Sequence, residues 1–167
     1  MMNDSNRISM HFSTRQAPTS EALSAVFGPL PPQDDPCHGV LVHQWQGPKH
    51  RVSVWQISIG QPAWASWLLY RAEPLAPQTA VTLLSPDGCW PQVLNETAIQ
   101  TVLDQGVALA WFDRVGLAWD GPDAQRGGPL HSHWPEVPWS ATSVWAWGMS
   151  YSITALTQAL PSLKFAV

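Results

Sequence analysis

The sequence predicts an α/β fold in which an antiparallel meander is followed by parallel βαβ units, and three observations predict it. Residues 38–73 hold three short runs rich in β-branched and aromatic residues, separated by Gly-Pro or Gly-Gln-Pro breaks. After Pro77, two unbroken apolar runs enclose one helical segment. A long apolar helical segment then precedes a last strand-like run. Strands that alternate with helices are typical of a parallel sheet.

The antiparallel part consists of "VLVHQWQ" (40–46), "RVSVWQISIG" (51–60) and "WASWLLYRAE" (64–73). Runs of this length joined by short turns are expected to pair as neighbours. In the second run the apolar residues change parity between Val54 and Trp55. This change predicts either a β-bulge or a strand that is covered on both faces.

The first βαβ unit begins with "TAVTLL" (79–84), whose apolar content predicts a strand buried on both faces. Asn95 is expected to cap a helix that ends before Gly106, a residue suited to a left-handed C-terminal cap. "VALAWF" (107–112) follows as a second buried strand, and the crossover is expected to be right-handed. The apolar residues of the helix fall on one face: Ala98, Ile99, Val102 and Leu103.

The rest of the chain is expected to form a long loop, a helix and a final strand. Residues 113–138 are rich in Gly and Pro and show no periodicity, which is typical of a binding loop or lid. Residues 139–160 predict a helix that Pro161 ends, and "LKFAV" predicts a strand. The helix should place one stripe against the sheet: Ala141, Trp145, Gly148, Ser152, Leu156 and Ala159.

Composition limits the class of protein. The 167 residues suit one domain, with 45% apolar and 12% charged residues, 11 tryptophans and 16 prolines. The polar, proline-containing residues 1–36 predict a flexible leader or linker, and residues 37–167 the domain. A net charge of −4 without a cluster of Lys or Arg excludes nucleic acid as a partner.

Membranes and cofactors are also excluded by the sequence. The amino terminus lacks the apolar core of a secretory signal, which predicts a cytoplasmic protein. The hydroxyl-rich composition of residues 139–160 argues against a membrane span. Cys37 and Cys89 are far apart and predict two reduced thiols, and no glycine-rich nucleotide motif is present. We therefore expect no cofactor.

Ser150 is the serine whose surroundings most resemble a nucleophile. "GMSYS" (148–152) differs by one residue from the G-x-S-x-G signature, which works at a sharp strand-to-helix turn. Ser150 instead falls in the middle of a predicted helix, where its hydroxyl should bond to a carbonyl one turn earlier. Ser85, Ser132 and Ser162 lack paired glycines as well. We therefore predict no catalytic residue in this sequence.

Two long segments resemble a known family. "LLSPDGCWPQVLNETAIQTVLDQGVALAWFDR" followed by "HWPEVPWSATSVWAWGMSYSITAL" is similar to the amino-terminal half of α/β-hydrolases related to the glucuronoyl esterases. In these proteins a Trp-Ala-Trp-Gly helix lies upstream of the catalytic elbow, and Trp145–Gly148 match it. Residues 106–114 match the preceding strand. The resemblance implies an incomplete α/β-hydrolase-like sheet and a carboxylic ester hydrolase for esters of uronic or similar sugar acids.

The same resemblance implies a serine nucleophile on the next strand and turn, then an acidic residue and a histidine. None of these has a counterpart in the sequence after "SLKFAV". We therefore expect the chain to end before the nucleophile elbow and to be inactive alone. A parallel sheet interrupted at this point would leave an apolar edge, which predicts self-association.

The turn after the first buried strand is the candidate support for catalysis. Asp87-Gly88-Cys89-Trp90 lies at the carboxyl end of residues 79–84, the edge where open α/β sheets bind ligands. The corresponding loop of α/β-hydrolases often supplies an oxyanion N–H. The backbones of Gly88 and Cys89 are therefore the oxyanion-loop candidates. A plain strand-to-helix turn is the alternative reading.

Two other hypotheses come from the long loop. Trp119, Trp134 and Trp139 lie in or beside it and could stack on sugar rings, which would make the chain a carbohydrate-binding domain without catalysis. The pair His131 and His133 could hold zinc in a metal hydrolase. The carboxylates of that loop would complete such a site, although spacing alone predicts no metal: Asp113, Asp120 and Asp123.

Overall fold

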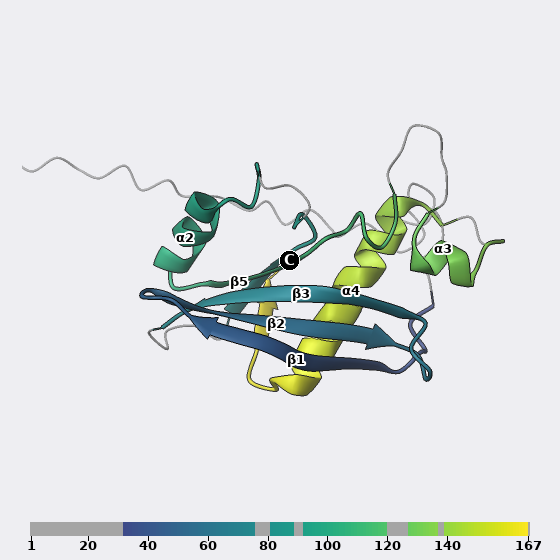
Figure 1. Cartoon of the computed structure of the whole chain (residues 1–167), viewed down its shortest axis with the longest axis horizontal. Coiled ribbons are helices and arrows are strands. Elements are labelled where there is room, and N and C mark those ends of the chain that lie inside the picture. The colour runs from purple at the N-terminus through teal and green to yellow at the C-terminus, as the bar shows by residue number, and fades with distance from the viewer. Residues whose placement is uncertain (1–31, 76–80, 89–91, 120–126, 137–138, 167) are drawn as a thin grey trace, which may run out of the picture.

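The computed structural model describes residues 32–75, 81–88, 92–119, 127–136 and 139–166. These residues form one six-stranded sheet of order β1-β2-β3-β5-β4-β6, with three helices (Figure 1). The elements follow in the predicted order: β1 (Cys37–Gln46), β2 (His50–Ile59), β3 (Ala65–Pro74), β4 (Val81–Ser85), α2 (Glu96–Asp104), β5 (Ala108–Phe112), α3 (Pro129–His133), α4 (Ala141–Ala159) and β6 (Lys164–Ala166).

The antiparallel meander is confirmed, because β1 pairs with β2 and β2 with β3. The irregularity in this part lies in β1, where Val42 is the extra residue between Leu41 and His43. It stands opposite Val54 and Trp55, where the parity of the sequence changes. β2 itself is regular against β3 and is buried on both faces from Val52 to Trp55. The second of the two predicted alternatives is therefore correct for β2.

The parallel part is also confirmed. β5 joins the meander antiparallel to β3, while β4 pairs in parallel with β5 on one side and with β6 on the other. Neighbouring residues of β5 belong to different cores, since Phe112 lies in the cluster beneath α4 and Trp111 packs on the cluster beneath α2. Adjacent side chains of a strand point to opposite faces, so α2 and α4 cover opposite faces of the sheet.

The predicted helix ends agree with the structure. Asn95 caps α2, with its Oδ1 accepting from the Ala98 amide at 2.9 Å. Gly106 adopts a φ of 75°, the left-handed conformation expected after the last turn. The helix predicted at residues 139–160 is α4, Ala141–Ala159, and its cap, Ser140, which is not among the predicted caps, accepts from the Ser143 amide at 3.1 Å. These ends depend on residues close in sequence, which is why the pattern predicts them.

Two expectations are wrong. β4 is not buried on both faces, because Thr82 and Leu84 are buried while Leu83 on the other face is 37% exposed. The physical reason is that α2 packs on β3 and β5 and leaves that face of β4 open. Residues 113–138 are not wholly irregular, since they contain the short helix α3. Five residues are too few to give a periodic signal.

None of the described helices is long and apolar enough to cross a membrane. α4, the longest of them, runs obliquely across β1 to β3 in Figure 1. Most of its predicted stripe is buried, as are several residues beside it: Val144, Trp147, Tyr151 and Ala155. Ala159 at its end is exposed. The helix therefore packs over more of its circumference than the stripe alone predicts.

Candidate functional site

The candidate site is the edge of the sheet where β4 and β5 end. The turns that follow these strands are joined by two backbone hydrogen bonds. The Gly88 amide donates to the Phe112 carbonyl at 2.9 Å, and the Arg114 amide donates to the Pro86 carbonyl at 3.2 Å. β6 is parallel to β4, so its carboxyl end points to the same edge. Open α/β sheets bind ligands at such an edge.

An ion pair and an aromatic ring hold the two turns together. An Arg114 amino nitrogen lies 2.9 Å from Asp87 Oδ1, and the guanidinium carbon lies 4.2 Å from the centre of the Trp145 ring. Trp145 in turn donates from Nε1 to the Ala118 carbonyl at 3.1 Å. A cation over an aromatic face is attracted by the ring quadrupole. Arg114 therefore connects both turns to the amino-terminal part of α4.

Gly88 is constrained by the close approach of β5. A Cβ at this position would lie 2.8 Å from the Phe112 carbonyl oxygen, so a larger residue would displace the turn. The Gly88 amide already donates to that same oxygen, and donation to an oxyanion would require this bond to open. Cys89 lies outside the described residues. The oxyanion role of Gly88 and Cys89 stays a prediction.

The Trp145–Gly148 motif joins the candidate site to the core. Trp147 is 1% exposed and contacts the rings of Trp64 and Trp67 at centroid distances of 5.8 Å. A Cβ on Gly148 would lie 2.3 Å from Cδ1 of Leu117, so glycine allows the 113–118 turn to approach α4. The motif therefore positions the segment that carries Arg114.

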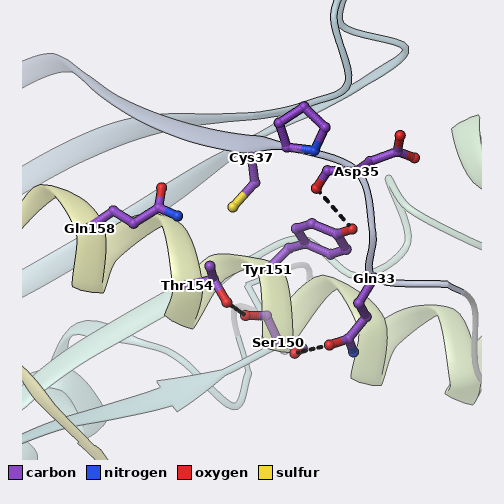
Figure 2. Close-up of a pocket in the computed structure, with 8 residues that line it drawn as sticks. Gln33, Asp35, Cys37, Ser150, Tyr151, Thr154 and Gln158 are labelled. Carbon is purple, nitrogen blue, oxygen red and sulfur yellow. Dashed lines mark hydrogen bonds between the residues drawn. The ribbon is translucent and has the colours of Figure 1, made fainter.

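Ser150 lies within α4, as the sequence predicts, and not at a strand-to-helix turn. Its Oγ donates to Oε1 of Gln33 at 3.2 Å (Figure 2). The predicted bond to a carbonyl one turn earlier is therefore wrong, because a hydroxyl has one proton to donate. Residues 32–36 pass along α4 and supply the alternative acceptor. Among the described residues, no histidine lines the cavity of 230 Å³ beside Ser150.

The same cavity contains Cys37 and Tyr151. Burial raises the pKa of the Cys37 thiol, which disfavours the nucleophilic thiolate. Burial, followed by the nearby charge of Asp35, raises the pKa of Tyr151. Tyr151 donates from its hydroxyl to the Asp35 carbonyl at 3.3 Å (Figure 2). Both groups are therefore neutral at neutral pH, and Tyr151 helps to hold residues 32–36 against α4.

The three candidate stacking tryptophans are not equivalent. Trp139 is 6% exposed, and its ring meets that of Trp134 edge to face at 5.3 Å. Trp134 is half-buried and contacts Trp64 edge to face at 4.8 Å. Trp119 is 63% exposed. Of the three, Trp119 offers an open ring to a ligand, whereas Trp134 and Trp139 pack into the core.

The two histidines of the H-x-H pair, His131 and His133, make different contacts in the structure. His131 is buried, with Nδ1 3.0 Å from the Gly127 carbonyl oxygen and Nε2 3.3 Å from that of Trp139. His133 stacks on Trp64 with ring centroids 4.3 Å apart. Asp120 and Asp123 lie outside the described residues. Among those that are described, no three His, Cys, Asp or Glu side chains are placed to hold a metal ion.

The fold resembles that of two solved esterases. One is a promiscuous CE15 esterase from the marine bacterial metagenome, with a TM-score of 0.55 and 12% identity, covering 83% of this chain and 45% of that chain. The other is the glucuronoyl esterase from Solibacter usitatus, with a TM-score of 0.57 and 15% identity, covering 81% of this chain and 45% of that chain. This chain has their fold. No protein-family model and no curated protein match the sequence.

The likeness to these esterases confirms the predicted α/β-hydrolase-like sheet. The chain spans less than half the length of either esterase, so the sheet is incomplete relative to theirs. No motif in the sequence singles out Arg114 or its contact with Asp87. A signal is present, because each residue stands two positions after the end of a strand at the same edge. The opposite charges at matched positions could have suggested the pair.

Proposed function

We propose that this chain forms part of a carboxylic ester hydrolase that acts on sugar-acid esters. The observation that carries the proposal is the esterase fold with two turns held together by Arg114 and Asp87 at the edge where such sheets bind ligands. A small-molecule or carbohydrate ester is the proposed ligand. A cytoplasmic location, with residues 1–36 as a flexible leader or linker, is part of the same proposal.

In this proposal the turn after β4 stabilises the oxyanion of the reaction. Backbone N–H groups aimed at the developing charge are the usual donors in such sites. The Cys89 amide follows directly on Gly88, whose position is fixed by the contact with β5. Arg114 does not bind the reacting atoms but holds the turn that carries the donors.

We also propose that residues 1–167 alone do not hydrolyse esters. The sequence has no G-x-S-x-G signature, and Ser150, the serine that comes nearest to it, lies within the helix α4. Without nucleophile and base, an esterase keeps at most the weak acceleration of its binding site. A nucleophile supplied after β6 would stand beside the carboxyl end of β4, because these strands are parallel.

The test has two parts. The purified 167-residue chain is assayed on p-nitrophenyl acetate and on the methyl ester of glucuronic acid, and both rates should equal those in buffer. The coding DNA is then read past codon 167 in all three frames, and a G-x-S-x-G motif should follow within about ten residues. Hydrolysis by the chain that is lost in Ser150→Ala would contradict the proposal, as would the absence of the motif in every frame.

The exposed ring of Trp119 favours a second candidate, a carbohydrate-binding domain without catalysis. Sugar rings stack on exposed aromatic faces. Intrinsic fluorescence would be titrated with neutral and uronic-acid oligosaccharides. Saturable binding that is lost in Trp119→Ala and kept in the control Trp45→Ala would support it. Equal binding by both variants would exclude Trp119 as the site.

A further inference from the structure

The two edges of the sheet differ in length and charge. Among the described residues β6 comprises three residues and begins with the charged Lys164, and it is the edge at which an incomplete α/β-hydrolase-like sheet would continue. β1 is ten residues long and, within the described chain, pairs only with β2. It forms the outer margin of the sheet in Figure 1. Its outer side therefore carries backbone N–H and C=O groups that no described strand satisfies.

The side chains of β1 do nothing to discourage pairing. Residues 37–46 contain no Lys, Arg, Asp, Glu or Pro, the residues that usually protect edge strands. The extra residue Val42 is the one protective feature, and it leaves regular stretches on both sides. Every residue from Val40 to Gln46 is exposed, including four large apolar ones: Val40 (58%), Leu41 (44%), Val42 (48%) and Trp45 (44%).

The unpaired backbone groups and uncharged side chains of β1 determine which kind of segment could pair with its outer side. Unpaired backbone groups along a strand are satisfied by another β-strand. That strand must be uncharged, because a charge beside Val40 or Leu41 would lose its hydration. β1 meets both requirements itself. A two-fold axis would bring two copies together antiparallel, which is the orientation that β1 already has with β2.

We propose that β1 pairs antiparallel with β1 of a second copy of this chain and so joins two sheets into one. The sequence predicts self-association through an apolar sheet edge beside the last strand. The structure favours the opposite edge, since β6 carries Lys164 whereas β1 is ten residues long and holds four exposed apolar side chains. The inference does not depend on the proposed esterase function.

The experiment measures mass by sedimentation velocity over a wide range of concentrations. Wild type should dimerise reversibly, and Leu41→Lys should raise the dissociation constant about tenfold or more, because the lysine occurs on both strands of the interface. Leu68→Lys is the matched control, since Leu68 is 45% exposed on the interior strand β3 and Leu41 is 44% exposed. Circular dichroism checks that both variants fold.

A second measurement needs no variant. Amide exchange of residues 40–46 in wild type should slow as concentration rises, while exchange in β3 stays constant. A monomer at every concentration would overturn the proposal. So would a dimer that Leu68→Lys weakens as much as Leu41→Lys. A monomer that binds the synthetic peptide VLVHQWQ would also overturn it, because β1 would then be a site for a foreign strand.

Discussion

The two faces of the sheet are unequally covered. Beneath α4 lies a large core in which Trp147, Phe112 and Leu156 are almost fully buried. Beneath α2 the buried residues are Val52, Ala72 and Leu103, with Ile99 and Trp111 at the margin. Two leucines on the α2 side stay exposed: Leu68 (45%) and Leu83 (37%). The core on the α4 face therefore contributes most of the stability of the fold, and the α2 face leaves apolar surface exposed to solvent.

Hydrogen bonds strengthen the same contrast. On the α4 face, several buried indole groups find acceptors on other elements, although the Trp64 Nε1 finds none within the described residues. Trp67 donates from Nε1 to Ser152 Oγ at 3.1 Å. Trp147 donates from Nε1 to the Pro32 carbonyl at 3.0 Å. A buried donor with an acceptor avoids the cost of an unmade bond. This network allows tryptophans to fill a core that would otherwise exclude their polar atoms.

The largest effect is expected from Trp147→Ala. Removing this ring leaves a cavity among Trp64, Trp67 and Tyr151, and the free energy of unfolding should fall by about 3–5 kcal/mol. Urea unfolding followed by circular dichroism measures the change. The control is Ala146→Ser at a neighbouring exposed position of α4, which should change stability by about 0.5 kcal/mol or less. A loss for Trp147→Ala no greater than the control would refute the dominance of the α4 face.

A smaller effect is expected from Leu103→Ala on the α2 face. The small core there can relax toward solvent, so the loss should lie near the lower end of the usual range, about 2 kcal/mol. The same urea titration compares the two variants directly. If Leu103→Ala destabilised the chain as much as Trp147→Ala, the two faces of the sheet would contribute equally to the stability of the fold.

The next prediction concerns the edge that carries the candidate site. Arg114→Met should cost about 1 kcal/mol, because both partners of its ion pair are partly exposed and the ring contact adds little more. The clearer readout is amide exchange, which should speed up at Gly88 and Arg114. Asp87→Asn should give the same pattern, with the double variant no worse than either alone. Additive losses would mean that the two residues act independently.

The smallest effect is expected from Ser150→Ala. Its hydrogen bond to Gln33 is exposed, so stability should change by about 0.5 kcal/mol or less. Thr154→Val serves as a matched control on the same exposed side of α4. A loss of several kcal/mol in Ser150→Ala alone would show that residues 32–36 contribute far more to the fold than their contacts suggest.

Much of the architecture follows from short stretches of sequence. Asn95 and Gly106 mark the ends of α2, and the breaks at Gly47-Pro48 and Gly60 separate the strands, because these conformations depend on near neighbours. The position of Ser150 inside a helix is determined in the same way. α3 is not predicted, because its five residues are too few to show the 3.6-residue periodicity of a helix.

The sequence alone determined the order of strands and helices and the absence of a nucleophile motif, since both are properties of local residue patterns. Only the tertiary structure decided that Leu83 is exposed, that Trp139 is buried and that Arg114 meets Asp87. It also gave Ser150 a partner 117 positions away. These outcomes depend on which elements pack together, and that packing is set by the whole chain rather than by neighbours along it.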